Sequence, residues 1–374
     1  MSALRVLVVG GGVTGSMLTI GLARRGVDVE LAEISQVWTG IGHGITMQGN
    51  ALLALRKVGV LDKVLAQGVP FENVRMRNAD GSLIVELTTP RTGGPDLPAT
   101  FGSLRSSLQA ILCRAAYASG ARVRLGTTVD SLTAQAQGVH VTLSDGTSSR
   151  YDLVVGADGI YSSIRRMIGI GTVAAPVGMG IWRVVAKRPP EMDCAELYYG
   201  GPRFKAGYSP ISDELCYAFV LDHNLDRSLI GERRAGAQLR EHAAGYGGTW
   251  GTIRDGLADD VIVNYQWIES ILLPDPWFRG RVIVIGDAAH ACPPLIAQGA
   301  AQCAEDAVVL AEELTADGDV DAALHRFMRR RMARVRMVVE NSMTLAEWEM
   351  RPDTPGADPA GIMSQTLSAL QEPA

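Results

Sequence analysis

Three glycines near the start of the chain have the spacing with which proteins bind the pyrophosphate of a dinucleotide. Gly10, Gly12 and Gly15 form the pattern G-x-G-x-x-G, with Val13 and Thr14 between the last two. The first glycine of such a pattern allows a sharp turn, the second leaves room for phosphate, and the third lets a helix pack closely on a strand. The N–H groups at the helix start would bind the phosphate oxygens. The spacing therefore predicts a dinucleotide site.

The segments around this turn are of the kind needed to position it. Residues 5–9 are a short β-branched apolar run, typical of a buried parallel strand. Residues 17–25 predict a helix, and residues 27–32 predict a second strand. Glu33 closes that strand, about 20 residues after the first glycine, where an acid binds a ribose hydroxyl. Strand, turn, helix, strand and acid together indicate a dinucleotide cofactor.

Two later strands also lead into acids that could serve a cofactor. Residues 151–166 repeat the buried strand, tight turn and helix, and Asp158 lies in the turn. Asp158 could cap the helix or face a cofactor, and the residues alone leave both interpretations open. Asp287 follows the apolar strand of residues 282–285, and a carboxylate in that position needs a hydrogen-bond donor.

The composition predicts a globular enzyme rather than a nucleic-acid or membrane protein. The chain has 374 residues, 47% apolar and 20% charged, and a net charge of −5. No N-terminal signal segment and no apolar run of ~18 residues is visible. The cysteines are odd in number and lack a C-x-x-C pair, so we expect a cytoplasmic protein without disulfides or a metal. The arginines within residues 326–336 are expected to solvate the outer face of the last helix.

The predicted fold is α/β, with a discontinuous Rossmann-like cofactor domain, an inserted β-rich substrate domain and C-terminal helices. Dinucleotide-domain patterns occur in separated blocks, with alternating strand patterns between them. Asn50 is expected to cap a helix, and the tail, which contains proline and glycine, is expected to be extended. The predicted boundaries are 1–70, 101–172 and 280–350 for the cofactor domain, 71–100 and 173–279 for the substrate domain, and 351–374 for the tail.

Four motifs in order make the prediction more specific. They are residues 10–33, Gly42-His-Gly-Ile45 with Asn50-Ala51, residues 152–165 and residues 286–306. In this order they resemble the single-component flavoprotein aromatic hydroxylases, the class A monooxygenases with the para-hydroxybenzoate hydroxylase fold. The resemblance spans nearly the whole chain. Ala297 replaces a glycine common in the family, as in some relatives that act on pyridine or salicylate rings, such as 6-hydroxynicotinate and salicylate hydroxylases.

The resemblance implies that the dinucleotide is FAD. Asp287 would accept a hydrogen bond from a ribityl hydroxyl, and Asp158 and Gly159 would lie near the pyrophosphate. Pro294 would lie over the flavin where oxygen reacts, and the helix after Ala297 would point its positive end at the flavin and stabilise its anionic reduced form. His290 is expected to be structural. The other predicted FAD contacts are Gly10, Gly12, Val13, Thr14, Gly15, Glu33, Gly44, Arg105, Gln109, Val129, Gln298, Gly299 and Ala300, although Arg105 could instead be a solvated cation at a helix start.

The implied reaction consumes NADH or NADPH and O2. The nicotinamide would reduce FAD, the reduced flavin would add oxygen at C4a, and the hydroperoxide would transfer OH to an aromatic or heteroaromatic ring. The protein would exclude water, position the ring and help to remove a phenolic proton. A second glycine fingerprint is absent, which argues against disulfide reductases and Baeyer–Villiger enzymes. The alternatives are a reductase or halogenase on the same fold, or a flavin-binding protein that sequesters a ligand without hydroxylating it.

The β-rich segment is expected to form the floor of the substrate pocket. Arg183, His43 and Tyr217 are the candidates for contacts with the ring, together with Pro294 above it. Arg183 could pair with a carboxylate or phenolate or be a strand-edge cation, His43 could reach the flavin or pack the loop, and Tyr217 could belong to the core. Thr46 stands where some relatives have a catalytic histidine, which argues against a histidine base. Further candidates are Met47, Tyr199, Tyr208 and Phe219. Dimers are common in the family, although no stretch identifies an interface.

Overall fold

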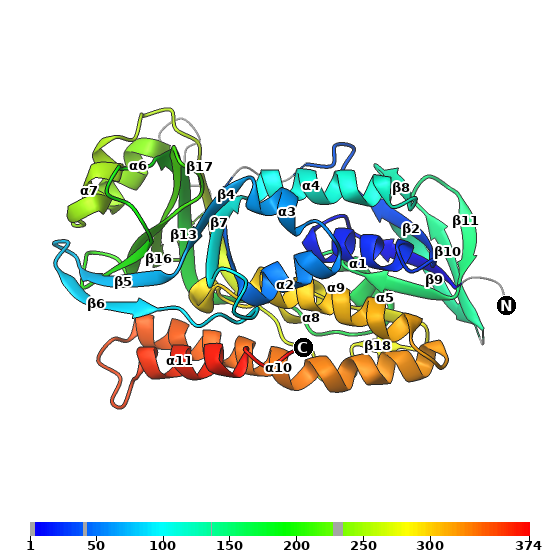
Figure 1. Cartoon of the computed structure of the whole chain (residues 1–374). Helices are drawn as coiled ribbons and strands as arrows, with labels where there is room; N and C mark the ends of the chain where they lie inside the picture. Colours follow the sequence, from blue (N-terminus) through cyan, green and yellow to red (C-terminus); the bar gives the residue numbers. More distant parts are fainter. Residues whose placement is uncertain (1–3, 40–42, 136, 227–234) are drawn as a thin grey trace.

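A computed structural model of the protein describes residues 4–39, 43–135, 137–226 and 235–374. Figure 1 shows two regions side by side, one built on a six-stranded sheet and the other on a seven-stranded sheet. The long helix α10 (Val320–Met350) runs beneath both regions. The predicted α/β fold class is therefore confirmed, whereas the exact domain boundaries stay a prediction. No described helix is long and apolar enough to cross a lipid bilayer.

The six-stranded sheet is the framework of the glycine turn. In order across the sheet, its strands are β18 (Phe278–Arg279), β19 (Val282–Val284), β12 (Leu153–Gly156), β1 (Arg5–Val9), β2 (Asp28–Glu33) and β8 (Arg122–Leu125). All neighbouring strands are parallel except β18 and β19. Their side chains share one core with α1 (Val13–Ala23), α4 (Arg105–Ala118) and a small antiparallel sheet of β9 (Val129–Gln135), β10 (Gly138–Leu143) and β11 (Ser148–Tyr151). This burial explains the continuous apolar runs in the sequence.

The seven-stranded sheet separates a core from a face that can meet a ligand. Its order is β17 (Val263–Ser270), β13 (Ala175–Lys187), β16 (Leu215–His223), β15 (Lys205–Pro210), β14 (Ala195–Tyr199), β5 (Asn73–Asn78) and β6 (Leu83–Thr88). Trp182 points into a core with residues of α6 (Ala235–His242) and α7 (Gly248–Asp255). Because successive strand residues point to opposite faces, Arg183 and Tyr217 lie on the other side of the sheet.

A three-stranded sheet joins the two regions. Its order is β3 (Gly44–Gln48), β7 (Thr100–Leu104) and β4 (Gly68–Phe71), and the helices α2 (Gly49–Lys57) and α3 (Leu61–Leu65) lie between β3 and β4 in the chain. A methyl group at Gly102 on β7 would come within 3.0 Å of the Pro210 carbonyl on β15. Thr46 Oγ1 also lies 3.1 Å from Ser209 Oγ. These contacts hold the seven-stranded sheet against the cofactor region.

The chain ends in helices that pack across both regions. They are α8 (Asp287–His290), the 3-10 helix η3 (Pro294–Ile296), α9 (Gly299–Thr315), α10 and α11 (Pro359–Ala369). The extended tail predicted from residue 351 was wrong, since α11 lies beside α10 (Figure 1). Asp358 caps α11 by accepting the Gly361 N–H, and proline is compatible with the first helical position. Leu367 and Leu370 are buried in one cluster with Leu345 of α10, and this burial holds α11 in place.

Candidate cofactor and substrate site

The glycine turn has the geometry that its spacing predicts. Gly10 has a φ of 103°, and a methyl group there would come within 3.0 Å of the Ala157 carbonyl. A methyl group at Gly15 would come within 3.0 Å of the Gly10 carbonyl, so only glycine allows this approach of helix and strand. Apart from its chain neighbours, no described residue would lie within 4 Å of a methyl group at Gly12. Space for a ligand is therefore present in front of the start of α1, where Val13 is half-buried and Thr14 is buried.

Glu33 and Gln109 both bind the backbone of Gly11, inside the glycine turn. Glu33 Oε2 accepts the Gly11 N–H at 2.6 Å, and its Oε1 accepts the Ser35 N–H at 2.8 Å. Gln109 Nε2 and Trp38 Nε1 donate to the Gly11 carbonyl at 2.7 and 2.6 Å. Glu33 is half-buried and each oxygen keeps a second lone pair, so its predicted ribose contact stays a prediction. The structure shows that both side chains shape the turn.

Asp158 binds the start of the helix α5 (Ser163–Met167), in line with one of its two open interpretations, although Ser162 occupies the N-cap position. Its Oδ2 accepts the N–H groups of Ser163 and Ile164 at 2.7 and 3.1 Å. The neighbouring Gly159 has a φ of 79°. Apart from its chain neighbours, no described residue would lie within 4 Å of a methyl group at this position. Arg165 braces this turn against α8, since its Nη1 donates to the Ala288 carbonyl at 2.7 Å. Asp158 thus orders a turn whose open side is at Gly159.

Asp287 begins α8 at the end of β19 and is half-buried. Among the described residues, its carboxylate accepts one side-chain hydrogen bond, from Cys303 Sγ at 3.5 Å, and a thiol is a weak donor. The acid therefore retains capacity for a stronger donor such as a hydroxyl. His290, three residues later, lies 2.6 Å from Asp306 through Nε2 and is buried, so its predicted structural role is supported by the geometry.

The turn before α9 presents backbone rather than side chains to the open side. Pro294 is exposed at the start of η3, and Ala297 has the left-handed φ of 54° that glycine adopts without strain. Gln298 is buried and points inward, where its Oε1 accepts hydrogen bonds from Asn50 Nδ2 and Gln302 Nε2, both at 3.0 Å. Outside its own stretch of chain, the nearest described atom to a methyl group at Gly299 would be Cys292 Sγ, at 3.9 Å. The free N–H groups of Gly299 and Ala300 thus begin α9 beside open space.

Arg183 and Tyr217 share the face of the seven-stranded sheet that meets β3. A methyl group at Gly44 on β3 would come within 3.0 Å of Tyr217 Cβ. Arg183 lies on an interior strand, so the strand-edge interpretation was wrong, and its Nη1 donates to Gln266 Oε1 at 3.0 Å. No carboxylate among the described residues pairs with Arg183. Burial raises the pKa of Tyr217, although Arg183 and Arg105 act in the opposite direction, so the phenol stays protonated at neutral pH.

His43 lies at the start of β3, close to the same cations. Burial and the charge of Arg183 lower its pKa to about 4, and Arg105 contributes in the same direction. Its imidazole is therefore neutral at pH 7, with Nδ1 3.3 Å from the Gly44 carbonyl. Arg105 begins α4 and is exposed, and none of the described acids pairs with it. Gly42, part of the same sequence motif, lies outside the described residues.

Of three other candidates, Tyr208 and Val129 lie in the cores of the two regions, whereas Tyr199 lies on the same face of the sheet as Arg183. Tyr208 is buried beside α7 and the Trp250 side chain, on the opposite face of the sheet, so its predicted ring contact was wrong. Val129 is buried in the cofactor-region core, so its side chain does not face a ligand. Tyr199 lies under the ammonium group of the buried Lys205, 5.6 Å from the ring centre.

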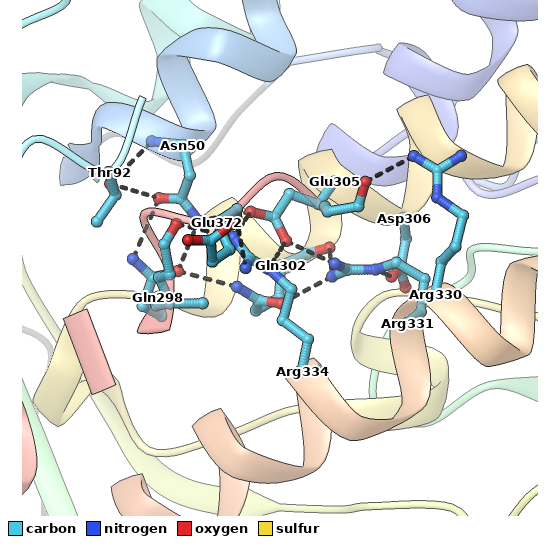
Figure 2. Close-up of polar contacts among 12 residues, drawn as sticks. Asn50, Thr92, Gln298, Gln302, Glu305, Asp306, Arg330, Arg331, Arg334 and Glu372 are labelled. Atoms are coloured by element: carbon cyan, nitrogen blue, oxygen red, sulfur yellow. Dashed lines mark hydrogen bonds and ion pairs between the residues drawn. The ribbon is translucent and has the colours of Figure 1, made fainter. Parts of the chain in front are cut away.

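A buried polar network between α9 and α10 was not predicted from the sequence (Figure 2). The predicted cap role of Asn50 was wrong, because α2 begins one residue earlier and the Asn50 side chain points into this network. Its charged members are Glu305 and Asp306 of α9 and Arg331 and Arg334 of α10. The expectation that the arginines of α10 are solvated holds for Arg329 and Arg336 but was wrong for Arg326, Arg330, Arg331 and Arg334, which pair with acids of α9. The acids at positions 305, 306, 312 and 313 were the sequence feature that could have predicted this pairing of α9 with α10.

Comparison with known proteins confirms the predicted resemblance. The model of the FAD binding domain family matches residues 3–342. The chain is 30% identical over 369 residues to YetM of Bacillus subtilis (strain 168), named as an FAD-dependent monooxygenase, covering 98% of this chain and 99% of YetM. It is 31% identical to 2-heptyl-3-hydroxy-4(1H)-quinolone synthase of Pseudomonas aeruginosa PAO1, covering 92% and 90% of the two chains. The crystal structure of Klebsiella pneumoniae HpxO with FAD and uric acid shares the fold, with a TM-score of 0.83, 23% identity and coverage of 98% and 92%.

Proposed function

This chain belongs to the FAD binding domain family, and on that premise we propose that it is a monooxygenase that uses FAD, NADH or NADPH and O2 to hydroxylate an aromatic or heteroaromatic ring. The observation that carries the proposal is the convergence of three turns at one edge of the six-stranded sheet. They follow the adjacent parallel strands β1, β12 and β19. Ligands of open α/β sheets bind at the carboxyl ends of such strands.

The residues at this edge fit FAD. Gly12 and Gly159 leave open space at two of the turns, and Asp287 brings a carboxylate with spare acceptor capacity to the third. We assign the pyrophosphate to the start of α1, the ribityl chain to Asp287 and the adenosine ribose to the side of Glu33. When bound, FAD supplies the electron transfer from NAD(P)H and the activation of O2.

The start of α9 would serve the flavin ring electrostatically. Its free N–H groups at Gly299 and Ala300 carry the positive end of a helix of 17 residues. Negative charge that develops nearby is stabilised by this end of the helix. Pro294 is exposed beside it and would cover the reacting edge of the ring system.

The sheet face with Arg183 and Tyr217 would hold the substrate. A guanidinium without a carboxylate partner among the described residues is suited to a phenolate, a carboxylate or a ring carbonyl. The protonated Tyr217 can donate a hydrogen bond, and the neutral His43 can donate or accept one. The ring carbonyl in the name of the quinolone synthase relative fits this set of donors.

The first test is the visible spectrum of the purified protein, followed by NADH and NADPH oxidation with phenols, benzoates, hydroxypyridines, quinolones and purines. We expect a yellow protein whose NAD(P)H oxidation is stimulated by one ring class. A flavoprotein that no ring stimulates would favour the ligand-sequestering alternative. A protein that cannot be reconstituted with FAD would overturn the proposal.

The residue test is Asp287→Ala, which should weaken FAD retention because a ribityl hydroxyl loses its acceptor. Asp145→Ala is the control, since this exposed acid lies in the β10–β11 turn. Wild-type flavin occupancy in the Asp287 variant would contradict the assignment of the ribityl chain.

A further inference from the structure

Arg331 on α10 is a fully buried arginine with three charged or polar partners on α9 (Figure 2). Its Nε donates to Asp306 Oδ1 at 2.7 Å, its Nη1 to Glu305 Oε2 at 2.6 Å, and its Nη2 to Gln302 Oε1 at 2.7 Å. Bidentate and branched contacts of this kind fix the orientation of the partner groups as well as their charge. Arg331 therefore sets the positions of three side chains at once.

The first branch leads from Asp306 to the turn that carries Asp287. Asp306 Oδ2 accepts the Gly286 N–H at 2.9 Å and lies 2.6 Å from His290 Nε2. Gly286 has the left-handed φ of 62° and directly precedes Asp287. Both ends of the α8 turn are thus held by one carboxylate, whose other oxygen is held by Arg331.

The second branch leads from Glu305 to the start of α9. Glu305 Oε1 accepts from Asn50 Nδ2 at 2.7 Å, and the same amide donates to Gln298 Oε1 at 3.0 Å. Gln302, which Arg331 also contacts, donates to the same Gln298 oxygen at 3.0 Å. Gln298 is the residue before the first turn of α9. The two turns assigned to the flavin end of the cofactor therefore share one anchor.

The charges of the network depend on this anchor. Burial alone would favour neutral carboxyl groups, but His290 and Arg331 lower the pKa of Asp306 to about 2. Burial opposes ionisation of Glu305 in the same way, and Arg331 and Arg334 lower its pKa. Without Arg331, two neighbouring buried carboxylates would lose their shared cation, which is costly in the interior.

We infer that Arg331 is a positioning residue for the proposed reaction, which holds the Asp287 turn and the start of α9 in one arrangement without reaching the site itself. The inference rests on the proposed function. Loss of Arg331 should loosen both turns at the flavin end, while the glycine turn at Gly12, anchored by Glu33 and Gln109, still holds the pyrophosphate. The expected consequence is weaker FAD binding and poorer use of the electrons taken from NAD(P)H.

The test compares Arg331→Met with Arg330→Met in the full chain. Arg330 is the adjacent residue and also pairs α10 with α9, through Glu312 and Glu313 at 3.0 and 2.8 Å, but its partners lie away from both turns. Thermal unfolding, the FAD dissociation constant, the flavin absorption spectrum and the share of NAD(P)H oxidation that ends as H2O2 are measured for each. Arg331→Lys keeps the charge but not the branched geometry.

We expect Arg331→Met to weaken FAD binding by about tenfold, the size of effect seen when residues that hold metal ligands are lost, and to change the flavin spectrum. In Arg330→Met the FAD affinity and the flavin spectrum should both match those of the wild type. The lysine variant should recover part of the affinity. Equal FAD affinities and spectra in the two methionine variants would overturn the inference and leave Arg331 a stability residue.

A second variant keeps the inference testable if Arg331→Met does not fold. Asp306→Asn retains the shape and an acceptor for Arg331 but loses a charge and one acceptor at the Gly286 turn, and it should also weaken FAD binding. Wild-type affinity in this variant would overturn the inference.

Failure of this inference can be distinguished from failure of the proposed function, because FAD binding and the flavin spectrum are measured without a substrate. If no ring is hydroxylated, the FAD measurements still decide the role of Arg331. A wild-type protein that does not bind FAD would overturn both.

Discussion

Gly44 and Tyr217 touch at the junction of the two sheets, so closely that a methyl group at position 44 would come within 3.0 Å of the tyrosine Cβ. Gly44 begins β3 in the cofactor region, and Tyr217 lies on β16 of the seven-stranded sheet. The contact places the face that carries Arg183 against the strand that follows His43. Substrate and cofactor residues therefore keep a fixed separation, as a reaction between two bound molecules requires.

Gly44→Ala should push β3 away from β16. Tyr217 Cβ cannot rotate away, so we expect a loss of stability of about 1–3 kcal/mol, the usual cost of overpacking. Urea unfolding of the variant and the wild type measures this difference in the free energy of unfolding. Gly256→Ala is the control, since a methyl group there would be 3.4 Å from its nearest neighbour, an ordinary contact. Equal stability of the two variants would show that the junction tolerates a side chain.

Gly12→Ala should fold normally but bind FAD poorly. The position has a φ of −68° and open space in front of it, so the cost falls on the phosphate and not on the fold. Gly171→Ala is matched, because a methyl group there also meets no described residue beyond its neighbours within 4 Å. Fluorescence titration with FAD should separate the two variants, and equal affinities would contradict the placement of the pyrophosphate.

Arg183→Met should impair turnover of rings that carry an acidic or carbonyl oxygen. Loss of a hydrogen bond to a charged group costs about 1.5–3 kcal/mol, which is roughly a 10- to 100-fold fall in kcat/KM. FAD affinity should be unchanged, since Arg183 lies on the substrate sheet. Unchanged kcat/KM for the best ring would remove Arg183 from the substrate site.

His43 should make the fold more stable as the pH rises from about 4 to 6.5. Its pKa is lowered to about 4 in the fold, so in this range the unfolded chain binds more protons than the native state. The stability gained because the buried imidazole is neutral is complete above the ordinary pKa of 6.5, and it is lost as the pH falls toward 4. Urea unfolding of the wild type and His43→Gln across this range measures the difference, and parallel curves for the two proteins would contradict it.

The C-terminal helix α11 should depend on its cap. Asp358→Ala removes the acceptor of the Gly361 N–H and should cost about 1 kcal/mol of stability. Asp353→Ala, at an exposed position before the helix, is the control. A larger effect of the control variant would show that the cap does not hold α11 on α10.

Local patterns in the sequence were sufficient for the elements of the cofactor region. The glycine spacing, the buried parallel strands and the acid after β19 each follow from a few neighbouring residues. The error at the tail was also local, since Asp358 followed by Pro359 is itself a helix start. The prolines and glycines of this segment favour an extended chain, but the cap at Asp358 outweighs them.

The polar network could not be predicted in the same way. Asn50 and Glu305 are far apart in the chain, and only the packing of α2 on α9 brings them together. Arg331 lies in a run of arginines whose members differ only in the side of α10 that they occupy. Whether such a side chain is solvated or buried is decided by the acids on the neighbouring helix, which periodicity within α10 does not reveal.

The most direct test of the proposed activity is the origin of the oxygen in the product. The wild-type protein is supplied with NAD(P)H, the ring that best stimulates its oxidation, and 18O2 in ordinary water, and the product is analysed by mass spectrometry. A monooxygenase places one 18O atom in each hydroxylated ring and the other in water. A product without 18O, or H2O2 as the sole oxygen product with every ring tested, would contradict the account.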